Sequence, residues 1–150
     1  MTTVLMLLTL SGCGDEDISK ASCDGRSPAD GAEVALQLTE LGYVFIDTGT
    51  SQGDTYQSII RDDADWAEQT SMWGSDGGLT PDFTAEAIFV NAWVYGGCGE
   101  AYTYGAWQWD DTLRVRASYA SEDTVCDGYM PQVDLMSVPL GEAEDIGWCE

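Results

Sequence analysis

The stretch Ala87–Tyr95 constrains the fold of this 150-residue chain most, because it is apolar on both faces of a β-strand. Successive side chains of a strand point to opposite faces. One face would carry Ile88, Val90, Ala92 and Val94, and the other Phe89, Trp93 and Tyr95. A strand with two apolar faces has to be covered on both sides. We therefore expect it near the centre of a sheet.

The segments around this strand predict a mostly antiparallel sheet. Val34–Leu41 alternates weakly and fits a strand or a short helix, of which we favour the strand. Clearer strands are expected at Tyr43–Ile46, Tyr56–Arg61, Tyr102–Trp109, Leu113–Tyr119 and Val133–Val138. Asp110-Asp111 would turn a hairpin in which Leu113, Val115, Ala117 and Tyr119 face inward and Arg114 and Arg116 face outward. Pro139 would end the last strand.

One main helix is expected at about residues 62–73. Asp62 or Asp63 can cap its first turn, Trp66, Thr70 and Trp73 share one face, and glycines between 74 and 78 end it. One helix against a mostly antiparallel sheet defines an α+β domain. We place this single globular domain at residues 33–150.

The first residues predict an export signal. The apolar run Val4–Leu10 is far shorter than the roughly 20 residues that span a bilayer. It leads into small residues and then into the acidic Asp15–Asp17, as a secretory signal peptide does. The alternative is a buried N-terminal strand with a core cysteine.

Leu10-Ser11-Gly12-Cys13 resembles the lipobox of bacterial prolipoproteins. The resemblance implies that residues 1–12 are removed and that Cys13 receives lipid and anchors the protein to a membrane. The following stretch is rich in Gly, Asp, Ser and Pro, so residues 13–32 are expected to form an acidic tether, part of which Cys23 would pin to the domain. It places the protein in the bacterial cell envelope, and Gly14 after the cysteine favours the outer membrane or cell surface. Met1-Thr2-Thr3 lacks the usual basic residue, which an upstream start codon would explain.

The cysteine count fits this interpretation. Five cysteines are odd for an exported protein, and assigning Cys13 to lipid leaves Cys23, Cys98, Cys126 and Cys149. No two have the spacing of a zinc or redox motif, so two disulfides are expected. Three pairings are possible, and we favour Cys98 with Cys126 and Cys23 with Cys149.

Charge and composition exclude several functions. The chain has 27 acidic and 5 basic residues, a net charge of −22 and no histidine. It would repel nucleic acid and anionic lipid, and it lacks the histidine of Ser-His-Asp and Cys-His sites. Asp62-Asp63 and Asp110-Asp111 could bind calcium, but a helix cap and a turn explain them without metal. We expect no metal, no cofactor and no enzyme, although the many acids leave an unassigned carboxylate pair for glycoside hydrolysis open.

An aromatic run marks the candidates for binding. On one regular strand Tyr102 and Tyr104 share one face, and Trp107 and Trp109 share the other. One pair would pack in the core, and an exposed pair would bind a sugar ring or a protein partner. The favoured alternative is that both faces are covered. A bulge at Gly105-Ala106 would instead bring all four onto one face.

Several short motifs between Tyr56 and Pro139 carry a second resemblance. Asp65-Trp66 in a capped helix, Pro81-Asp82-Phe83 before an apolar strand, a hairpin and the ending Val138-Pro139 resemble a PrcB-like domain. This small domain of bacterial lipoproteins is named for the PrcB subunit of a spirochaete protease complex. Its Gly-Gly-Tyr is Gly96-Gly97-Cys98 here. The resemblance implies a non-catalytic domain that associates with or stabilises another protein, and the alternative is an envelope polysaccharide-binding module.

Overall fold

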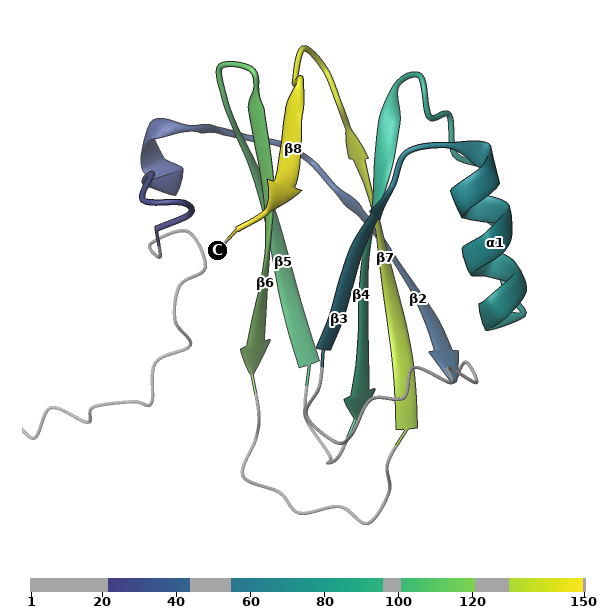
Figure 1. The fold of residues 1–150 in the computed structure, drawn as a ribbon. Coiled ribbons are helices and arrows are strands. Elements are labelled where there is room, and N and C mark those ends of the chain that lie inside the picture. The colour runs from purple at the N-terminus through teal and green to yellow at the C-terminus, as the bar shows by residue number, and fades with distance from the viewer. Residues whose placement is uncertain (1–21, 44–54, 96–100, 121–129, 150) are drawn as a thin grey trace, which may run out of the picture.

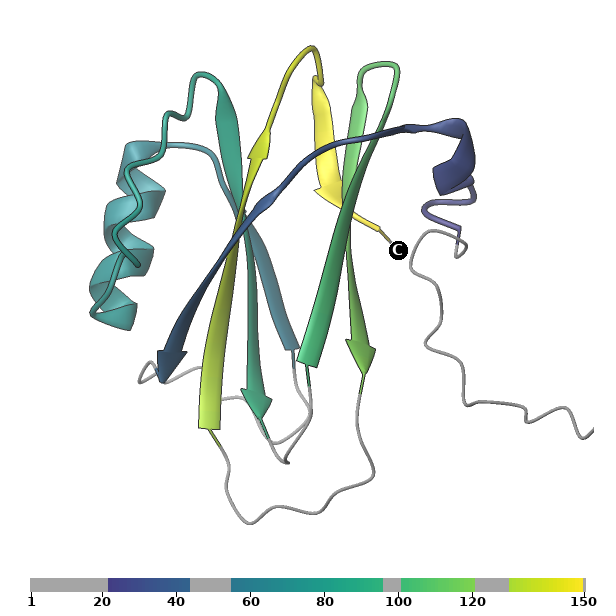
Figure 2. The ribbon, with the colours of Figure 1, turned by 180° about the vertical axis from the view of Figure 1, so that it is seen from behind.

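The domain is built from two four-stranded sheets that face each other, with one α-helix on the outer side of one sheet (Figures 1 and 2). A computed structural model describes residues 22–43, 55–95, 101–120 and 130–149. The expected class is confirmed, because one main helix packs on mostly antiparallel sheets and a disulfide links Cys23 to Cys149. That the strands divide into two sheets was not predicted.

The first sheet has the order β1-β5-β6-β8. Its strands are β1 (Ala32–Glu33), β5 (Ala101–Trp109), β6 (Thr112–Ala120) and β8 (Asp145–Trp148). β5 and β6 form the expected hairpin across Asp110-Asp111, where Asp110 adopts a φ of 53°. A two-residue hairpin loop needs such positive φ values, which Asp tolerates better than most residues. β8 runs parallel to β6, whereas every other described pair is antiparallel.

The second sheet has the order β2-β7-β4-β3. Its strands are β2 (Gln37–Tyr43), β7 (Met130–Pro139), β4 (Glu86–Tyr95) and β3 (Thr55–Ile60). β4 is an inner strand, as its two apolar faces predicted. The strand favoured over residues 34–41 is also present, beginning later as β2. Of the strand expected at Tyr43–Ile46, only Tyr43 lies within the described residues.

The helix α1 (Asp63–Trp73) begins and ends where its capping residues predicted. The Asp62 carboxylate accepts from the backbone N–H groups of Ala64 and Asp65, both at 2.9 Å. These bonds satisfy donors that have no partner inside the helix. Gly74 follows with a φ of 71°, the left-handed conformation that commonly ends a helix.

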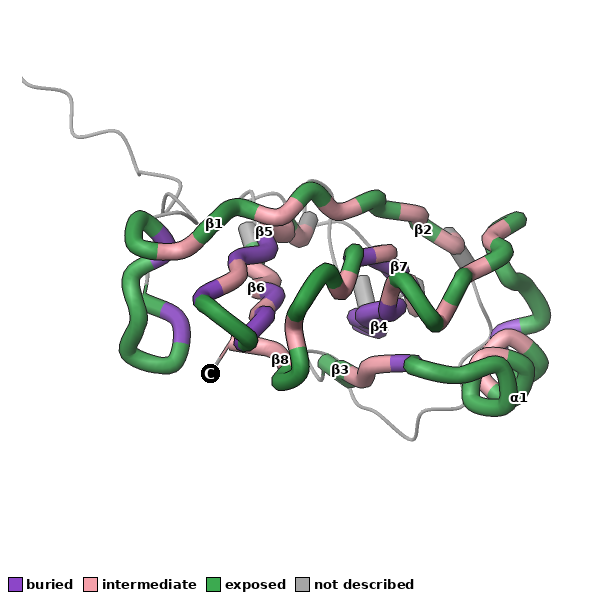
Figure 3. The backbone as a smooth tube through the Cα atoms, turned by 90° about the horizontal axis from the view of Figure 1, so that it is seen from above, coloured by how far each residue is buried: buried purple, intermediate pink, exposed green. Residues whose placement is uncertain are grey.

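The second sheet separates two cores. Figure 3 shows the first sheet, the second sheet and α1 as successive layers seen from above. Ile88, Val90 and Ala92 face α1 and pack with the buried Ile60, Trp73, Val133 and Leu135. Ala87 and Phe89 face the other sheet and pack with the buried Ala106, Leu113, Val115, Met136 and Val138. The fold therefore has three layers, in the order first sheet, second sheet, helix.

The expectation that Val133–Val138 forms the last strand is wrong, because β8 follows it. β8 is short, and its alternating Ile146 and Trp148 are separated by Gly147. Four residues are too few for a clear alternating pattern. Both large side chains nevertheless pack against the core between the sheets.

Residues 22–33 belong to the folded domain, so the segment predicted as a tether is folded onto the domain from residue 22 onward. The backbone N–H groups of Cys23 and Arg26 each donate to the other residue's carbonyl at 2.8 Å, which closes a turn at Asp24-Gly25. The 3-10 helix η1 (Pro28–Asp30) and β1 follow. In the described part of the chain, no helix is long and apolar enough to cross a membrane.

Candidate interaction site

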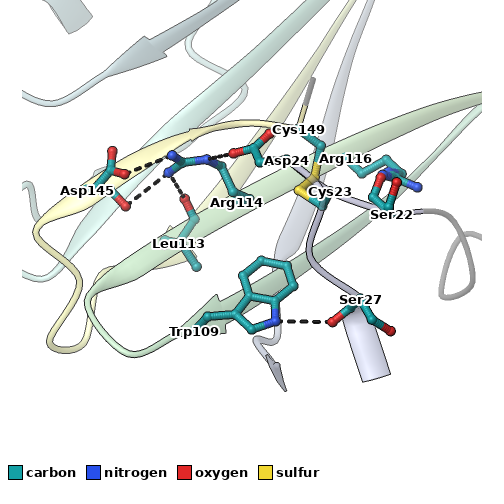
Figure 4. Close-up of a disulfide and its surroundings, with 10 residues drawn as sticks. All are labelled: Ser22, Cys23, Asp24, Ser27, Trp109, Leu113, Arg114, Arg116, Asp145 and Cys149. Carbon is teal, nitrogen blue, oxygen red and sulfur yellow. Dashed lines mark hydrogen bonds and ion pairs between the residues drawn. A yellow bond between two sulfur atoms is a disulfide. The ribbon is translucent and has the colours of Figure 1, made fainter. Parts of the chain in front are cut away.

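The Cys23–Cys149 disulfide joins the two ends of the described chain, as predicted, with an S–S distance of 2.01 Å. It lies against the outer face of the first sheet (Figure 4). Cys98 and Cys126, which we expected to pair, lie outside the described residues, as does Cys13.

Trp107 and Trp109 are covered by the N-terminal segment and form a small core with the disulfide. Only 5% of Trp107 and 9% of Trp109 is exposed. The Trp109 indole donates to the Ser27 carbonyl at 3.1 Å (Figure 4). Two glycines permit this packing. A Cβ on Gly31 would lie 2.7 Å from the Trp109 indole, and a Cβ on Gly105 would lie 2.4 Å from the Trp107 indole. Neither tryptophan is available to an external ligand.

The Gly105-Ala106 bulge is absent, since the β5–β6 register runs without a shift from Ala101 to Trp109. Tyr102 and Tyr104 therefore face the second sheet, opposite to Trp107 and Trp109. The structure brings the two tyrosines together and separates them from the two tryptophans.

An aromatic cluster of Trp93, Tyr102, Tyr104 and Tyr119 occupies one end of the space between the sheets. Tyr102 is at its centre, with ring centroids 5.0 Å from Trp93, 5.2 Å from Tyr119 and 6.2 Å from Tyr104. Offset and edge-on contacts at such distances favour packed aromatic rings. Because the rings contact one another, the cluster is a solid surface and not a cage for a ligand.

Asp134 anchors the buried side of the cluster. Its carboxylate accepts from the Tyr104 hydroxyl, from the Trp93 indole at 3.1 Å and from the Gln132 amide at 2.9 Å. Asn91 donates to the Tyr104 oxygen at 2.9 Å. Asp134 is 2% exposed, so these donors compensate for the loss of water around its charge.

Burial and the neighbouring Asp134 carboxylate raise the pKa of the Tyr104 phenol above its ordinary value. Burial disfavours the phenolate, and the hydrogen bond to Asp134 is lost when the phenol loses its proton. Tyr104 therefore stays neutral over the physiological range and fixes the position of Tyr102 beside it.

The outer side of the cluster is accessible at Tyr119, which is 50% exposed. Tyr119 points toward the space between the sheets, as expected, but half of its surface remains exposed to solvent. Tyr102 is half-buried, and its hydroxyl lies 3.0 Å from the Thr55 hydroxyl on the opposing sheet. A half-exposed tyrosine on a fixed aromatic base is a typical anchor for a protein partner.

Arg114 neutralises two acids beside the disulfide. Its guanidinium lies 2.5 Å from Asp24 and 2.8 Å from Asp145 (Figure 4). The bond to Arg114 lowers the pKa of the Asp145 carboxyl. Arg116 donates to the Ser22 carbonyl. These two arginines of β6 hold the N-terminal segment on the sheet, so neither is a free cation.

The acidic pairs that could have bound calcium have structural roles. No group of three or more Cys, Asp and Glu residues there could hold a metal ion. Asp62 serves as a helix cap, and Asp110-Asp111 forms a turn. Ser137 donates to Glu86, but the other oxygen of Glu86 accepts from the Asp82 N–H at 2.8 Å, which marks the pair as part of a turn.

Sequence reasoning missed Trp93, Tyr119 and Asp134 as members of the site. Trp93 and Tyr119 were assigned to strands without being connected to Tyr102, because their proximity depends on how two sheets face each other. Asp134 interrupts an otherwise apolar strand between Val133 and Leu135. A lone acid in such a strand was the available signal for a buried polar contact.

The geometry defines a disulfide-linked α+β domain with an aromatic cluster at one end that is exposed at Tyr119. Comparisons with family models, curated proteins and solved structures find no match.

Proposed function

We propose that the protein is a non-enzymatic, lipid-anchored protein of the bacterial cell envelope whose domain binds another protein through the aromatic cluster. The observation that carries the binding role is Tyr119, half exposed on rings that Asp134 and Tyr104 hold in place. Tyrosines that need little further ordering are favoured at protein interfaces, because less entropy is lost on binding.

Charge restricts the partner. A domain in a chain of net charge −22 repels acidic surfaces, so the partner surface is neutral or basic. The polysaccharide alternative requires an exposed pair of aromatic side chains. Trp107 and Trp109 are buried, so they cannot stack on a sugar ring. A protein partner is therefore the favoured ligand of the cluster.

A photo-crosslinking experiment in intact cells tests the binding role. Tyr119 is replaced with a photoreactive phenylalanine analogue, and the matched control carries it at Met72, which is 58% exposed on α1. We expect position 119 to give one defined crosslinked protein that position 72 does not give. The same products from both positions, or none from 119, would contradict the proposed interface.

Anchoring through Cys13 has its own test. The Cys13→Ser variant should leave the membrane fraction and lose the mass of the lipid, whereas Ser11→Ala keeps a small residue and should stay anchored. An intact mass that retains Met1 in the wild-type protein would refute the lipoprotein interpretation.

A further inference from the structure

β8 covers only the first half of β6. It pairs with residues 112–115, and the Cys149 N–H then donates to the Val115 carbonyl at 2.8 Å. The disulfide holds Cys149 against Cys23 on the outer face of the sheet. Within the residues that the structure describes, no strand pairs with this edge of β6 beyond Val115, and β6 continues to Ala120 (Figure 1).

The backbone direction along this edge follows from the bond to Val115. Alternate residues of a strand direct their N–H and C=O groups to the same side. Since the Val115 carbonyl faces β8, the N–H and C=O groups of Ala117 face the same edge one step further on. The residues on either side of Ala117, Arg116 and Ser118, pair with Gly105 and Thr103 of β5.

Of the other sheet edges of the described chain, those of β3 and β2 are less available, whereas residues 101–105 of β5, which β1 does not reach, are also unpaired on that side. On the edge strand β3, the carbonyl of Ser58 accepts from the Trp148 indole. On β2, the register shifts between Glu40 and Tyr43. Irregular and covered edges prevent further pairing in natural sheets. The segment 116–120 is regular and proline-free, and its first residue, Arg116, contacts the N-terminal segment through the Ser22 carbonyl.

We propose that residues 116–120 of β6 receive an extended, neutral or basic segment of the partner as an additional strand of the first sheet. This inference rests on the proposed function and names how the partner binds. The added strand continues the line of β8, and its inward side chains contact the exposed face of Tyr119. Such strand addition gives affinity through backbone bonds and selectivity through alternate side chains.

Charge selects this occupant over a second copy of the chain. Two copies would each bring a net charge of −22 to the contact. A segment of neutral or positive net charge complements this net charge, with a neutral residue beside the outward-facing Arg116, because like charges on neighbouring strands repel.

The test selects a phage library of random dodecapeptides against the full-length, oxidised protein. We expect enriched peptides to be rich in strand-forming residues and in Lys or Arg, and to lack Asp and Glu. In the wild-type protein the bound peptide should slow hydrogen exchange of the Ala117 amide by about tenfold or more, since a paired amide exchanges only on opening. Replacing the basic residues of the peptide with Glu should abolish binding.

The variant Ala117→Pro removes the outward N–H without removing a bond to β5, and edge strands tolerate proline. It should weaken peptide binding about tenfold or more, the equivalent of one lost hydrogen bond. Tyr56→Ala on β3 is the matched control and should bind normally. If Ala117→Pro does not fold, slowed hydrogen exchange of the Ala117 amide in the peptide-bound wild-type protein still tests whether the peptide pairs with this edge.

Three results would overturn strand addition, namely no enriched peptide, protection elsewhere than Ala117, or a self-associated protein whose Ala117 is protected without peptide. A crosslink from position 119 together with any of these would leave the protein-binding role intact. If a peptide pairs with Ala117 but position 119 gives no crosslinked protein in cells, the proposed binding of a cellular protein is contradicted.

Discussion

The indole Nε1 of Trp148 lies 3.3 Å from the carbonyl oxygen of Ser58, so the last strand of the first sheet is bonded to the edge strand of the second. The same ring meets Phe89 edge-on with centroids 5.3 Å apart. Trp148 thus closes one half of the open side of the sandwich, and the aromatic cluster lies in the other half.

Trp148 should contribute more through packing than through its hydrogen bond. Trp148→Phe keeps a ring against Phe89 and should cost about 1–2 kcal/mol of unfolding free energy. Trp148→Ala removes the ring and should cost about 3–5 kcal/mol. Chemical denaturation measures both, and equal losses would show that the bond to Ser58 dominates.

Loss of the Cys23–Cys149 disulfide should destabilise the domain strongly, because the bridge closes a loop with a sequence separation of 126. The chain-entropy model gives about 4–5 kcal/mol for a loop of this length. The Cys23→Ser, Cys149→Ser double variant, compared with the wild type by thermal unfolding, measures the effect. Peptide mapping under non-reducing conditions checks the pairing, and an unchanged melting temperature would contradict the prediction.

Tyr104 should make the protein sensitive to alkali. The raised pKa of its phenol contributes stability that is fully present below about pH 10, the ordinary value, and lost as pH rises toward the folded-state pKa. Tyr104→Phe should remove this alkaline loss and cost about 1–3 kcal/mol at neutral pH, because Asp134 loses a buried donor. Tyr56→Phe, an exposed change, is the control and should leave neutral stability unchanged.

Gly31 should be intolerant of a side chain. The Cβ of Gly31→Ala would stand 2.7 Å from the Trp109 indole, so the N-terminal segment should lift from the sheet and expose that ring. Trp fluorescence should shift to the red, with a loss of about 1–3 kcal/mol. Gly147→Ala is the matched control, since its Cβ meets Arg114 at an ordinary 3.5 Å. Equal tolerance of both alanines would contradict the packing.

Moderate salt should stabilise the protein, because a net charge of −22 repels itself and ions screen that repulsion. The melting temperature should rise between low salt and about 0.15 M NaCl, where the screening length is about 8 Å. An equal osmolarity of sucrose controls for general solvent effects. A flat or falling melting temperature would show that the charges are already compensated locally.

Local features of this fold were predictable from sequence because the interactions that determine them join residues only a few positions apart. Asp62 and Gly74 satisfy the ends of α1 wherever the helix packs, and Asp110-Asp111 turns the hairpin by its own backbone preferences. The two apolar faces of β4 likewise required cover on both sides, whichever elements supplied it.

Apart from the Cys23–Cys149 pairing, features that depend on how distant segments pack together were not predictable. Trp107 and Trp109 are buried because residues 22–31 fold back over β5, and no local pattern indicates that return. The aromatic cluster joins β4, β5 and β6 across two sheets, so apart from Tyr102 and Tyr104, which alternate along β5, its members have no common spacing in sequence. β8 pairs with a strand about thirty residues earlier, as Thr112 does with Asp145.

The order in which the chain is made sets when this domain can close. The thiol of Cys23 is among the first groups of the domain to be synthesised, and its partner Cys149 follows every strand. Until β8 is present, Phe89 and the core between the sheets lack Trp148. Until β8 has been synthesised, a partly made chain therefore lacks both the disulfide and this part of the core.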